Sequence, residues 1–569
     1  MSTFVIFFDM RAERNLFLLL FLFILGTAIY AQRINSPKYE YRAVWVTTIE
    51  NLDWPRTQVK TFADIEVQKR ELAQMLDSLR MLNVNTVMLQ TRVRGDVLYP
   101  SEIEPFSKVL TGVAGQNPGY DPFAFAIEEC HKRGMQLHAW IVTLPLGKVQ
   151  HVRELGRHAL KNKQPQLCRV YRGSWYMEPG EPGTVDYLRR LVNEIVSKYD
   201  VDGIHLDYVR YPDFAKSYPD DYLFRRYGSG RSLADWRRDN ITRIVRGIYS
   251  EVKSLKPWVR VSCAPLGKYD DLGNYSSRGY NARRTVFQDA RLWLAEGIVD
   301  MLCPMVYFRG NDFYPFVLDW QENACGRHIV PGIGTYRLLK EYGDWEVGEV
   351  QRQLLTSRGA GTSGTSMFRA RHLLDNIKGF TDVYSRIYDR FVPVPPITWH
   401  TAAALEAPSG FCGVRNGDTL TLRWNKVASA DGMPAVRYNI YASTDSAVDI
   451  SNVDNLMAVG LSDTLFAWNG STLNTMHWAV VAVDAYGTEG DAALWSERGH
   501  IPALMREVFH LPPPATWGMR LILRDAVGAV LYKGRYRTRI GVRGLPPGMY
   551  LLEIVSRDGS VLRRIPFSR

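Results

Sequence analysis

Between about residues 40 and 390, short apolar runs alternate with segments in which apolar residues recur at helical spacing. Eight runs have the length and composition of buried strands: 41–48, 85–92, 135–142, 201–207, 259–265, 299–308, 328–336 and 364–368. The first helical segment places Ile65, Leu72, Leu76 and Leu79 on one face, and Ser232-x-x-Asp235 is typical of a capping box. Eight such units predict an α/β fold, a (β/α)8 TIM barrel. A doubly wound open sheet is the alternative, although no Gly-rich phosphate loop follows the first run.

The chain after the predicted barrel changes in composition and period. Residues 392–400 contain Val392-Pro-Val-Pro-Pro396, which predicts a stiff linker between the barrel at 32–391 and the C-terminal segments. Over 401–500 apolar residues alternate with polar ones, as in a β-sandwich. An early Trp424 and a late Trp478-x-Val strand make this segment resemble a fibronectin type III domain.

The last segment is predicted to be a small β domain at 518–569, after a second linker at 501–517. Its Leu545-Pro-Pro-Gly-Met-Tyr550 stretch and final strand resemble the C-terminal sorting domain of type IX secretion substrates. This segment has eleven Lys or Arg against three Asp or Glu, so it carries most of the chain's net charge of +11. The barrel is therefore not expected to bind nucleic acid. The basic domain either contacts an anionic surface, such as an envelope polysaccharide, or is simply a solvated face.

The N-terminus is typical of a secretory signal. Arg11 and Arg14 precede the apolar run 16–25, and a small residue, Ala31, ends a cleavage-like segment. We therefore expect residues 1–31 to be removed and the protein to be exported to the periplasm, the cell surface or the medium. The apolar run is too short to span a bilayer, so no transmembrane span is expected in the mature chain. The oligomeric state is not indicated by the sequence.

The run at 201–207 contains the first catalytic candidate. Side chains alternate along a strand, so Ile204 and Leu206 point one way and His205 and Asp207 the other. A polar pair on a buried strand is costly unless it is used, and barrel enzymes keep their chemistry at the C-terminal ends of their strands. Asp207 is therefore predicted to be catalytic. The alternative is a carboxylate that is salt-bridged to Arg210 and only orders a loop.

Other predicted strands place polar or aromatic side chains at the same end. The pairs predicted to share a face are Gln90 with Arg92, His138 with Trp140, Trp45 with Thr47, and Met305 with Tyr307. Loops add Asp53 with Trp54 and Asp96 with Tyr99. Asp53 and Asp96 have the alternative role of capping their own turns. His138 and His205 have the alternative role of hydrogen-bonded core residues.

Carboxylates, aromatic rings, Arg and Gln together suit a polysaccharide substrate, because sugar rings stack on aromatic faces and sugar hydroxyls pair with planar polar groups. Glycoside hydrolysis typically uses two carboxyl groups. Asp207 is predicted to be the nucleophile or base and Asp96 the second catalytic residue, with Asp53 and Asp312 behind it. Substrate assistance, which needs only one protein acid, is the alternative. The predicted substrate-binding residues are Trp45, Asp53, Gln90, Arg92, His138, Trp140, His205, Arg210 and Tyr307.

Other chemistries have no sequence support. The six cysteines are scattered without metal-ligand spacing, and no His-x-x-x-His, Cys-x-x-Cys or Asp-rich calcium loop is present. We therefore expect no metal and no cofactor. No Gly-x-Ser-x-Gly motif is present, which argues against an acyl hydrolase.

Five motifs, in this order, resemble the glycosyl hydrolase-like 10 family. They are Tyr41-Arg-Ala-Val-Trp-Val-Thr-Thr with Asn51-Leu-Asp-Trp-Pro55, Gln90-Thr-Arg with Gly95-Asp-Val-Leu-Tyr-Pro-Ser101, His131-Lys-Arg-Gly with His138-Ala-Trp140, Asp202-Gly-Ile-His-Leu-Asp207, and Asp235-Trp-Arg-Arg-Asp-Asn240. The resemblance implies a (β/α)8 barrel and glycosidase activity. It also implies a bacterial cell-wall glycan as substrate, including peptide-free peptidoglycan strands.

The chain departs from the family pattern at three places. Tyr208 follows Asp207 where the family has a second acid, Met305 replaces a Gln, and Pro265-Leu-Gly-Lys268 replaces Pro-Phe-Gly-Ile. The main hypothesis is an exported glycoside hydrolase. These departures leave open a non-catalytic glycan-binding surface protein on the same barrel. The fibronectin-like segment leaves open a protein-interaction scaffold.

Overall fold

The computed structural model describes part of the chain: residues 36–275, 279–400, 404–430, 432–445, 447–470, 476–496, 503–504, 508–511, 519–526, 528–542, 545–546 and 548–568. The predicted signal at 1–31 lies outside these residues, as does most of the predicted linker at 501–517. Among the described residues, no helix is both long and apolar enough to cross a bilayer. The domain boundaries proposed from the sequence stay predictions.

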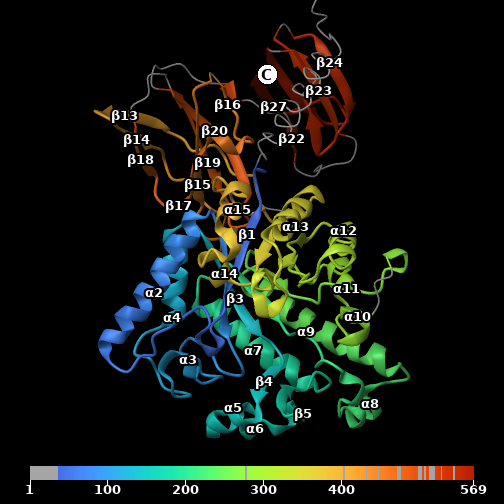
Figure 1. Cartoon of the computed structure of the whole chain (residues 1–569). Coiled ribbons are helices and arrows are strands. Elements are labelled where there is room, and N and C mark those ends of the chain that lie inside the picture. The colour runs from blue at the N-terminus through green and yellow to red at the C-terminus, as the bar shows by residue number, and fades with distance from the viewer. Residues whose placement is uncertain are drawn as a thin grey trace, which may run out of the picture. The chain divides into compact units, whose positions relative to one another are not determined.

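The N-terminal region is built on a nine-stranded parallel sheet (Figure 1). Its order is β10-β9-β8-β7-β3-β2-β1-β12-β11. The strands are β1 (Tyr41–Val46), β2 (Thr86–Arg92), β3 (Gln136–Val142), β7 (Gly203–Asp207), β8 (Arg260–Cys263), β9 (Met301–Leu302), β10 (His328–Ile329), β11 (Gly332–Ile333) and β12 (Gly364–Met367).

The two ends of this sheet meet in one stretch of chain. Strands β10 and β11 are separated by only two residues, and β10 pairs with β9 whereas β11 pairs with β12. A further parallel bridge joins Met305 to Gly332. The nine segments thus occupy eight strand positions and close into a TIM-like barrel, so the predicted α/β fold class is confirmed.

Helices alternate with these strands, and the longer ones cover the outside of the sheet (Figure 1). They are α2 (Phe62–Met81), α3 (Lys108–Thr111), α4 (Pro122–Lys132), α7 (Pro182–Lys198), α8 (Asp221–Tyr227), α9 (Leu233–Leu255), α10 (Ala282–Thr285), α11 (Ala290–Ala295), α12 (Tyr314–Glu322), α13 (Val347–Gly359), α14 (Ala370–Leu374) and α15 (Phe380–Ile387). The apolar face predicted for α2 is buried. The Ser232 hydroxyl accepts the backbone N–H of Asp235 at the start of α9, which is the N-cap half of the predicted capping box; the Asp235 carboxylate accepts the Ser232 hydroxyl rather than its backbone N–H.

The barrel strands separate two apolar cores. Ile204 and Leu206 belong to the outer core between sheet and helices, whereas Trp45 and Trp140 belong to a smaller core inside the barrel. Because successive side chains of a strand point to opposite faces, His205 and Asp207 lie on the inner side, as predicted.

The connection between β3 and α7 folds into a small insert that the sequence analysis did not predict. Strands β4 (Pro145–Lys148), β5 (Cys168–Tyr171) and β6 (Ser174–Met177) form an antiparallel sheet in the order β4-β6-β5. Helices α5 (Val149–Glu154) and α6 (Leu160–Lys163) lie between β4 and β5 in the chain (Figure 1).

The 401–500 segment forms two antiparallel sheets, of orders β13-β14-β18 and β17-β15-β19-β20. Their strands are β13 (Cys412–Asn416), β14 (Thr419–Arg423), β15 (Arg437–Ser443), β17 (Leu456–Leu461), β18 (Leu465–Asn469), β19 (His477–Val483) and β20 (Glu489–Ser496). Leu420 and Leu422 of one sheet share a core with Ile440 and Trp478 of the other, so the two sheets pack face to face.

The last segment is also antiparallel, in the order β24-β23-β26-β27. Its strands are β23 (Arg520–Asp525), β24 (Val530–Arg535), β26 (Met549–Val555) and β27 (Val561–Ser568). Short strands pair separately: β16 (Ala447–Val448) with β21 (Ala503–Leu504), and β22 (Val508–His510) with β25 (Arg539–Gly541). Small β domains after the barrel are therefore confirmed in outline.

Candidate functional site

Asp207 ends β7 at the C-terminal mouth of the barrel and is 5% exposed. Its Oδ2 accepts the indole N–H of Trp140 at 3.1 Å, and its Oδ1 accepts the backbone N–H of Tyr208 at 2.7 Å. Burial raises the pKa of Asp207 to about 6, although these donors and the charge of Arg210 act in the opposite direction. The carboxyl group is therefore poised to exchange a proton near neutral pH.

Arg210 is not tied to Asp207. Its guanidinium instead donates to Asp213 Oδ1 at 2.6 Å and lies over the ring of Tyr208, 4.8 Å from its centre. Within the described part of the chain, Asp207 forms no ion pair. The alternative of a loop-ordering Asp207–Arg210 salt bridge is therefore not what the structure contains.

Tyr208 turns the chain sharply at this point. Its φ is +51°, in the left-handed region that a non-glycine residue adopts at a cost of about 1 kcal/mol. The turn directs the Tyr208 N–H back onto Asp207 and leaves its side chain 38% exposed. Strain of this kind is common at functional sites.

Aromatic rings surround Asp207 at the mouth. Tyr307 stacks on Phe368 with ring centres 5.6 Å apart, and Trp140 and Tyr336 meet Phe368 edge-on at 6.5 Å and 6.1 Å. Trp140 and Tyr307 were predicted site residues, whereas Phe368 and Tyr336 were missed. Phe368 directly follows β12, so the rule that placed Asp207 could also have found it.

Trp45 and His205 form a hydrogen-bonded chain inside the barrel. The Trp45 indole N–H donates to His205 Nε2 at 3.0 Å, and His205 Nδ1 lies 2.8 Å from the Ser262 hydroxyl. Burial, with His138 as a further cause, lowers the pKa of His205 to about 3. A neutral His205 that accepts at Nε2 carries its proton on Nδ1 and donates it to Ser262. His205 therefore supports the floor of the site without titrating near pH 7.

His138 lies deeper in the barrel than Asp207. It pairs in register with Gly203, at the start of β7, and its ring covers the position that a Gly203 side chain would fill. Burial, together with Arg260, lowers its pKa to about 4. The structure does not bring His138 to the mouth. It is a core residue whose Nε2 lies 3.3 Å from Gln136 Oε1, whereas its Nδ1 is buried without a hydrogen-bond partner among the described residues.

Gln90 and Arg92 do not share a face, because the pairing of β2 with β3 shifts register between them. Gln90 Oε1 accepts the backbone N–H groups of Thr48 and Ile49, so it holds the loop after β1. The Arg92 guanidinium makes two 2.7 Å hydrogen bonds to Glu104 and is fully buried. A sequence pattern cannot show such a bulge, and here it redirects Arg92 away from the inner face.

Asp53 and Asp312 are occupied by other contacts. Asp53 accepts the Thr47 N–H at 2.8 Å and pairs with Arg369, and burial raises its pKa despite that cation. Asp312 pairs with Lys268 at 2.6 Å. Trp54 and Tyr99 are fully buried in the outer core.

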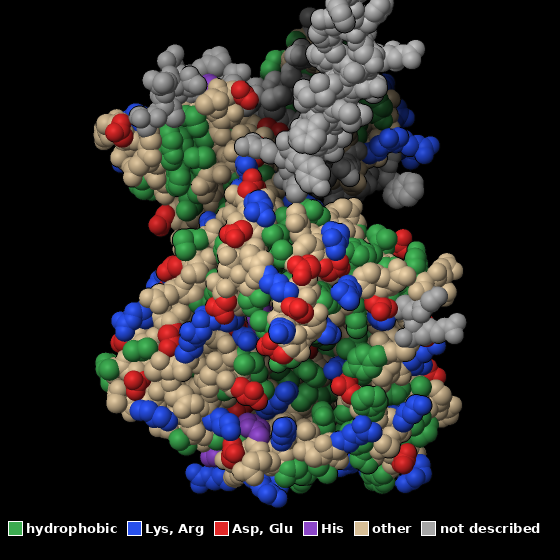
Figure 2. Space-filling view, in the orientation of Figure 1, with side chains coloured by type: hydrophobic (Ala, Val, Ile, Leu, Met, Phe, Trp, Pro, Cys, Tyr) green, Lys and Arg blue, Asp and Glu red, His purple; other side chains and the backbone are tan. Residues whose placement is uncertain are grey.

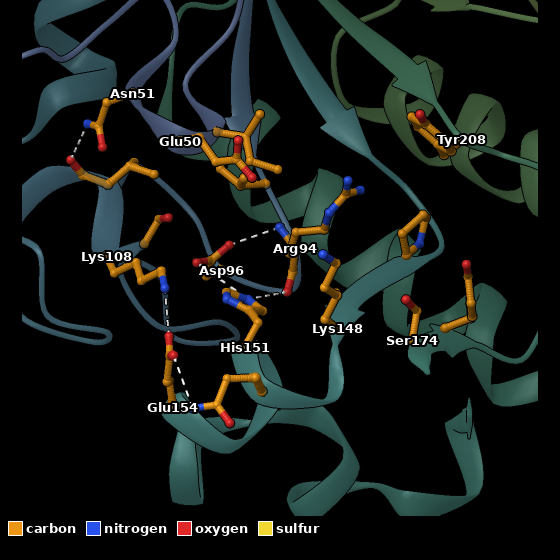
Figure 3. Close-up of a pocket in the computed structure, with 18 of the residues that line it drawn as sticks. Glu50, Asn51, Arg94, Asp96, Lys108, Lys148, His151, Glu154, Ser174 and Tyr208 are labelled. Atoms are coloured by element: carbon orange, nitrogen blue, oxygen red, sulfur yellow. Dashed lines mark hydrogen bonds and ion pairs between the residues drawn. The ribbon is translucent and has the colours of Figure 1, made fainter. Parts of the chain in front are cut away.

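A cavity of about 620 Å³ opens beside Tyr208 and Arg210 (Figure 3). The loop after β2 lines it with Arg94 and Asp96, and the insert lines it with Lys148 and His151. Asp96 Oδ1 accepts the Arg94 N–H at 2.9 Å, which is the turn-capping role considered from the sequence. Its Oδ2 is buried without a hydrogen-bond partner among the described residues and lies 3.9 Å from His151.

The His, Cys, Asp and Glu side chains of the described residues do not suggest a metal site. Among the described residues, no three His, Cys, Asp or Glu side chains are grouped as metal ligands. All six cysteines are free thiols.

Comparison with known proteins places this barrel in a family. The glycosyl hydrolase-like 10 model matches residues 40–331, just over half of the chain. The chain belongs to the glycosyl hydrolase-like 10 family.

Two relatives illustrate the match. The chain is 30% identical over 390 residues to "Glycosyl hydrolase YngK" of Bacillus subtilis (strain 168), covering 65% of this chain and 76% of that protein. It is 32% identical over 368 residues to "Glycosyl hydrolase DigH" of Escherichia coli (strain K12), covering 58% and 83%. Among solved structures, the PgaB (BpsB) glycoside hydrolase domain from Bordetella bronchiseptica has a TM-score of 0.41 at 14% identity, over 61% of this chain and 99% of that one.

Proposed function

We propose that this protein is a glycoside hydrolase and that Asp207 transfers the proton of the reaction. The observation that carries the proposal is the environment of Asp207: a buried carboxyl at a barrel mouth, held by two neutral donors, with a pKa of about 6. A carboxyl of raised pKa is what glycosidases use to protonate the leaving oxygen. The nucleophile or base role expected from the sequence needs the ionised carboxylate, which a pKa of about 6 also supplies at neutral pH, so it is the alternative role of Asp207.

The surrounding rings support a sugar as the bound group. Trp140, Tyr307 and Phe368 present aromatic surface next to the carboxyl, and the apolar face of a pyranose ring stacks on such surface. Asp96 is the candidate for the second carboxyl group, because it lines the adjoining cavity and its buried Oδ2 has no hydrogen-bond partner among the described residues. Substrate assistance is the alternative if Asp96 has no role in turnover.

We further propose a bacterial cell-wall glycan, with peptidoglycan strands first, as the substrate of an exported enzyme. The names of the relatives support glycosyl hydrolysis, and the signal-like N-terminus supports export.

We propose that 401–500 is a fibronectin type III-like spacer, because its sheets have three and four strands in the orders β13-β14-β18 and β17-β15-β19-β20. The basic last domain is proposed as a sorting or envelope-contact module.

Tyr208 favours one second candidate, a non-catalytic glycan-binding protein. Where the family pattern has another acid, this chain presents a half-exposed ring under Arg210, which is a binding surface rather than a proton carrier.

Product analysis by mass spectrometry separates these functions. The full mature chain is incubated with intact peptidoglycan, amidase-stripped peptidoglycan and a panel of plant and host glycans. We expect new oligosaccharides in one lane and a loss of about 10²–10⁴-fold in rate for Asp207→Asn. Asp202→Asn, which changes a carboxylate at the opposite end of the same strand, is the matched control and keeps its activity. Saturable binding without product in any lane would overturn the hydrolase in favour of the binding protein.

A further inference from the structure

The cavity beside Tyr208 contains cations that the fold does not use. It is lined by four Lys or Arg side chains, Arg94, Lys108, Lys148 and Arg210. Lys108 pairs with Glu154 at 2.6 Å and Arg210 with Asp213 at 2.6 Å. For the guanidinium of Arg94 and the ammonium of Lys148, the described residues supply neither an ion pair nor a hydrogen bond. These two charges are therefore free to bind a ligand.

The two free cations come from different elements and converge. Arg94 belongs to the loop after β2, and Lys148 ends β4 of the insert. Figure 3 shows both side chains lining the same cavity, with no dashed line reaching the guanidinium of Arg94 or the ammonium of Lys148. In the space-filling view, basic side chains lie in the region of β4 and α5 together with acidic ones (Figure 2).

The acids of the cavity do not neutralise this pair. Glu154 and Asp213 are held by Lys108 and Arg210, and Asp96 is held by the Arg94 backbone and lies beside His151. Glu50 is exposed on the rim. His151 Nε2 lies 3.2 Å from the Arg94 carbonyl oxygen, so it donates there and fixes the backbone that carries the Arg94 side chain.

One of the free cations, Arg94, also lies close to the proposed reaction centre. Arg94 is 5.8 Å from the centre of the Tyr208 ring, and its charge lowers the pKa of Asp207 in part. A ligand group bound between Arg94 and Lys148 would thus occupy the space next to the sugar at Asp207. A guanidinium and an ammonium in a cavity suit a planar carboxylate, which accepts two hydrogen bonds from Arg and one from Lys.

We propose that Arg94 and Lys148 form a subsite for the carboxylate of an acidic sugar that neighbours the one at Asp207. This subsite rests on the proposed function and gives it a substrate class, a carboxylate-bearing glycan. The carboxylate has two chemical sources, a lactyl ether on an amino sugar or the C6 group of a uronic acid.

Binding to a variant with strongly reduced turnover tests the subsite separately from catalysis. Full-length Asp207→Asn is titrated with amidase-stripped peptidoglycan strands and with a polyuronate, each beside the same glycan after reduction of its carboxyl groups to alcohols. We expect at least one acidic glycan to bind about tenfold or more tightly than its reduced form, with a preference that weakens at high salt. The glycan that shows the preference identifies the carboxylate source.

Substitutions test whether Arg94 and Lys148 cause the preference for the acidic over the reduced glycan. Arg94→Gln with Lys148→Gln, in the Asp207→Asn background, is expected to reduce the preference to below about twofold, whereas Arg94→Lys keeps part of it. Lys108→Gln removes a paired lysine from the same cavity and is expected to keep most of it, because exposed pairs contribute little. Circular dichroism and melting curves check that each variant is folded.

The outcomes separate the subsite from the hydrolase. Equal binding of acidic and reduced glycans, or equal losses for Lys108→Gln and the double variant, overturns the subsite. If wild type makes product without any charge preference, the hydrolase stands and the subsite fails. If charge-selective binding follows Arg94 and Lys148 but wild type makes no product, the subsite stands and the hydrolase fails.

Discussion

Two carboxylates at the N-terminal end of the barrel, Asp300 and Asp202, differ from Asp207 at the C-terminal end in the groups that hold them. At the N-terminal end, Asp300 immediately precedes β9 and is fully buried, with Oδ2 2.7 Å from Lys253 and 2.7 Å from the Val261 N–H. Asp202 immediately precedes β7, and its Oδ2 accepts from His131 and from the Leu137 N–H, both at 2.8 Å. At the C-terminal end, Asp207 has only neutral donors. Asp300 and Asp202 are therefore held in place by basic partners. Asp207 has no such partner, and its raised pKa lets it gain or lose a proton near pH 6.

The largest change in the free energy of unfolding is expected at the N-terminal end of the barrel, at Asp300. Asp300→Asn leaves the ammonium of Lys253 buried without its partner, which we expect to lower the free energy of unfolding by about 3–5 kcal/mol. Urea unfolding measures this loss. Adding Lys253→Met removes the stranded charge, so the double variant should recover part of the loss. A double variant no more stable than Asp300→Asn would contradict the pairing argument.

At pH 7–8, Asp207→Asn is expected to raise the free energy of unfolding, whereas Asp300→Asn lowers it. Because the folded pKa of Asp207 is about 6, above the ordinary carboxyl value of 3.8, its contribution to stability is full at low pH and is lost as pH rises through about 6. The neutral Asn avoids that loss and should raise the free energy of unfolding by about 1–3 kcal/mol. Melting curves from pH 4 to 8 test this. If Asp207→Asn were still as much more stable than wild type at pH 4, the contrast between Asp207 and the paired carboxylates would be wrong.

Asp202→Asn should cost about 1 kcal/mol at pH 6, because the Asp202–His131 pair is only partly shielded from water. Burial raises the pKa of Asp202, but His131 outweighs it and the net pKa is lowered. The stabilisation is therefore present above the ordinary Asp pKa and is lost as pH falls through the lowered value. The His131 pKa is raised, because Asp202 outweighs the burial of His131, so the pair also weakens when pH rises through that value. Melting temperatures across pH 3 to 9 should show wild type to be more stable than Asp202→Asn only between the lowered pKa of Asp202 and the raised pKa of His131.

The smallest effect is expected for Trp140→Phe, which removes one donor to the ionised form of Asp207. The pKa of Asp207 should then rise by about half a unit to one unit. If the proposed function holds, the limb of the pH–rate profile near pH 6 moves upward by that amount. An unchanged limb with reduced activity would mean that Trp140 acts only by stacking on the substrate.

Local patterns predicted the barrel and the position of Asp207. Alternation placed His205 and Asp207 on the inner face correctly, because β7 is a regular strand. The same rule failed for Arg92, because the register of β2 against β3 shifts after Gln90, and only the neighbouring strand reveals that shift. Glu104, which binds Arg92, lies in a loop that has no pattern to read.

The partners of the charged groups could not be predicted for the same physical reason. The sequence contains Arg210 three residues after Asp207, but only the folded loop shows that Arg210 pairs with Asp213. Asp53 likewise pairs with Arg369, which is more than 300 residues away in the chain. Phe368, in contrast, could have been found, since it directly follows β12 at the same end of the barrel where Asp207 ends β7.

The insert between β3 and α7 has a wider consequence. Lys148 and His151 are carried on a segment with its own three-stranded sheet, whereas Asp207, Trp140 and Tyr307 are fixed by the barrel strands. In the proposed function, the carboxyl that transfers the proton is thus fixed by a barrel strand, whereas Lys148 of the proposed subsite is carried by the insert. The insert can diverge, or be exchanged by a protein engineer between related barrels, while Asp207 remains in place.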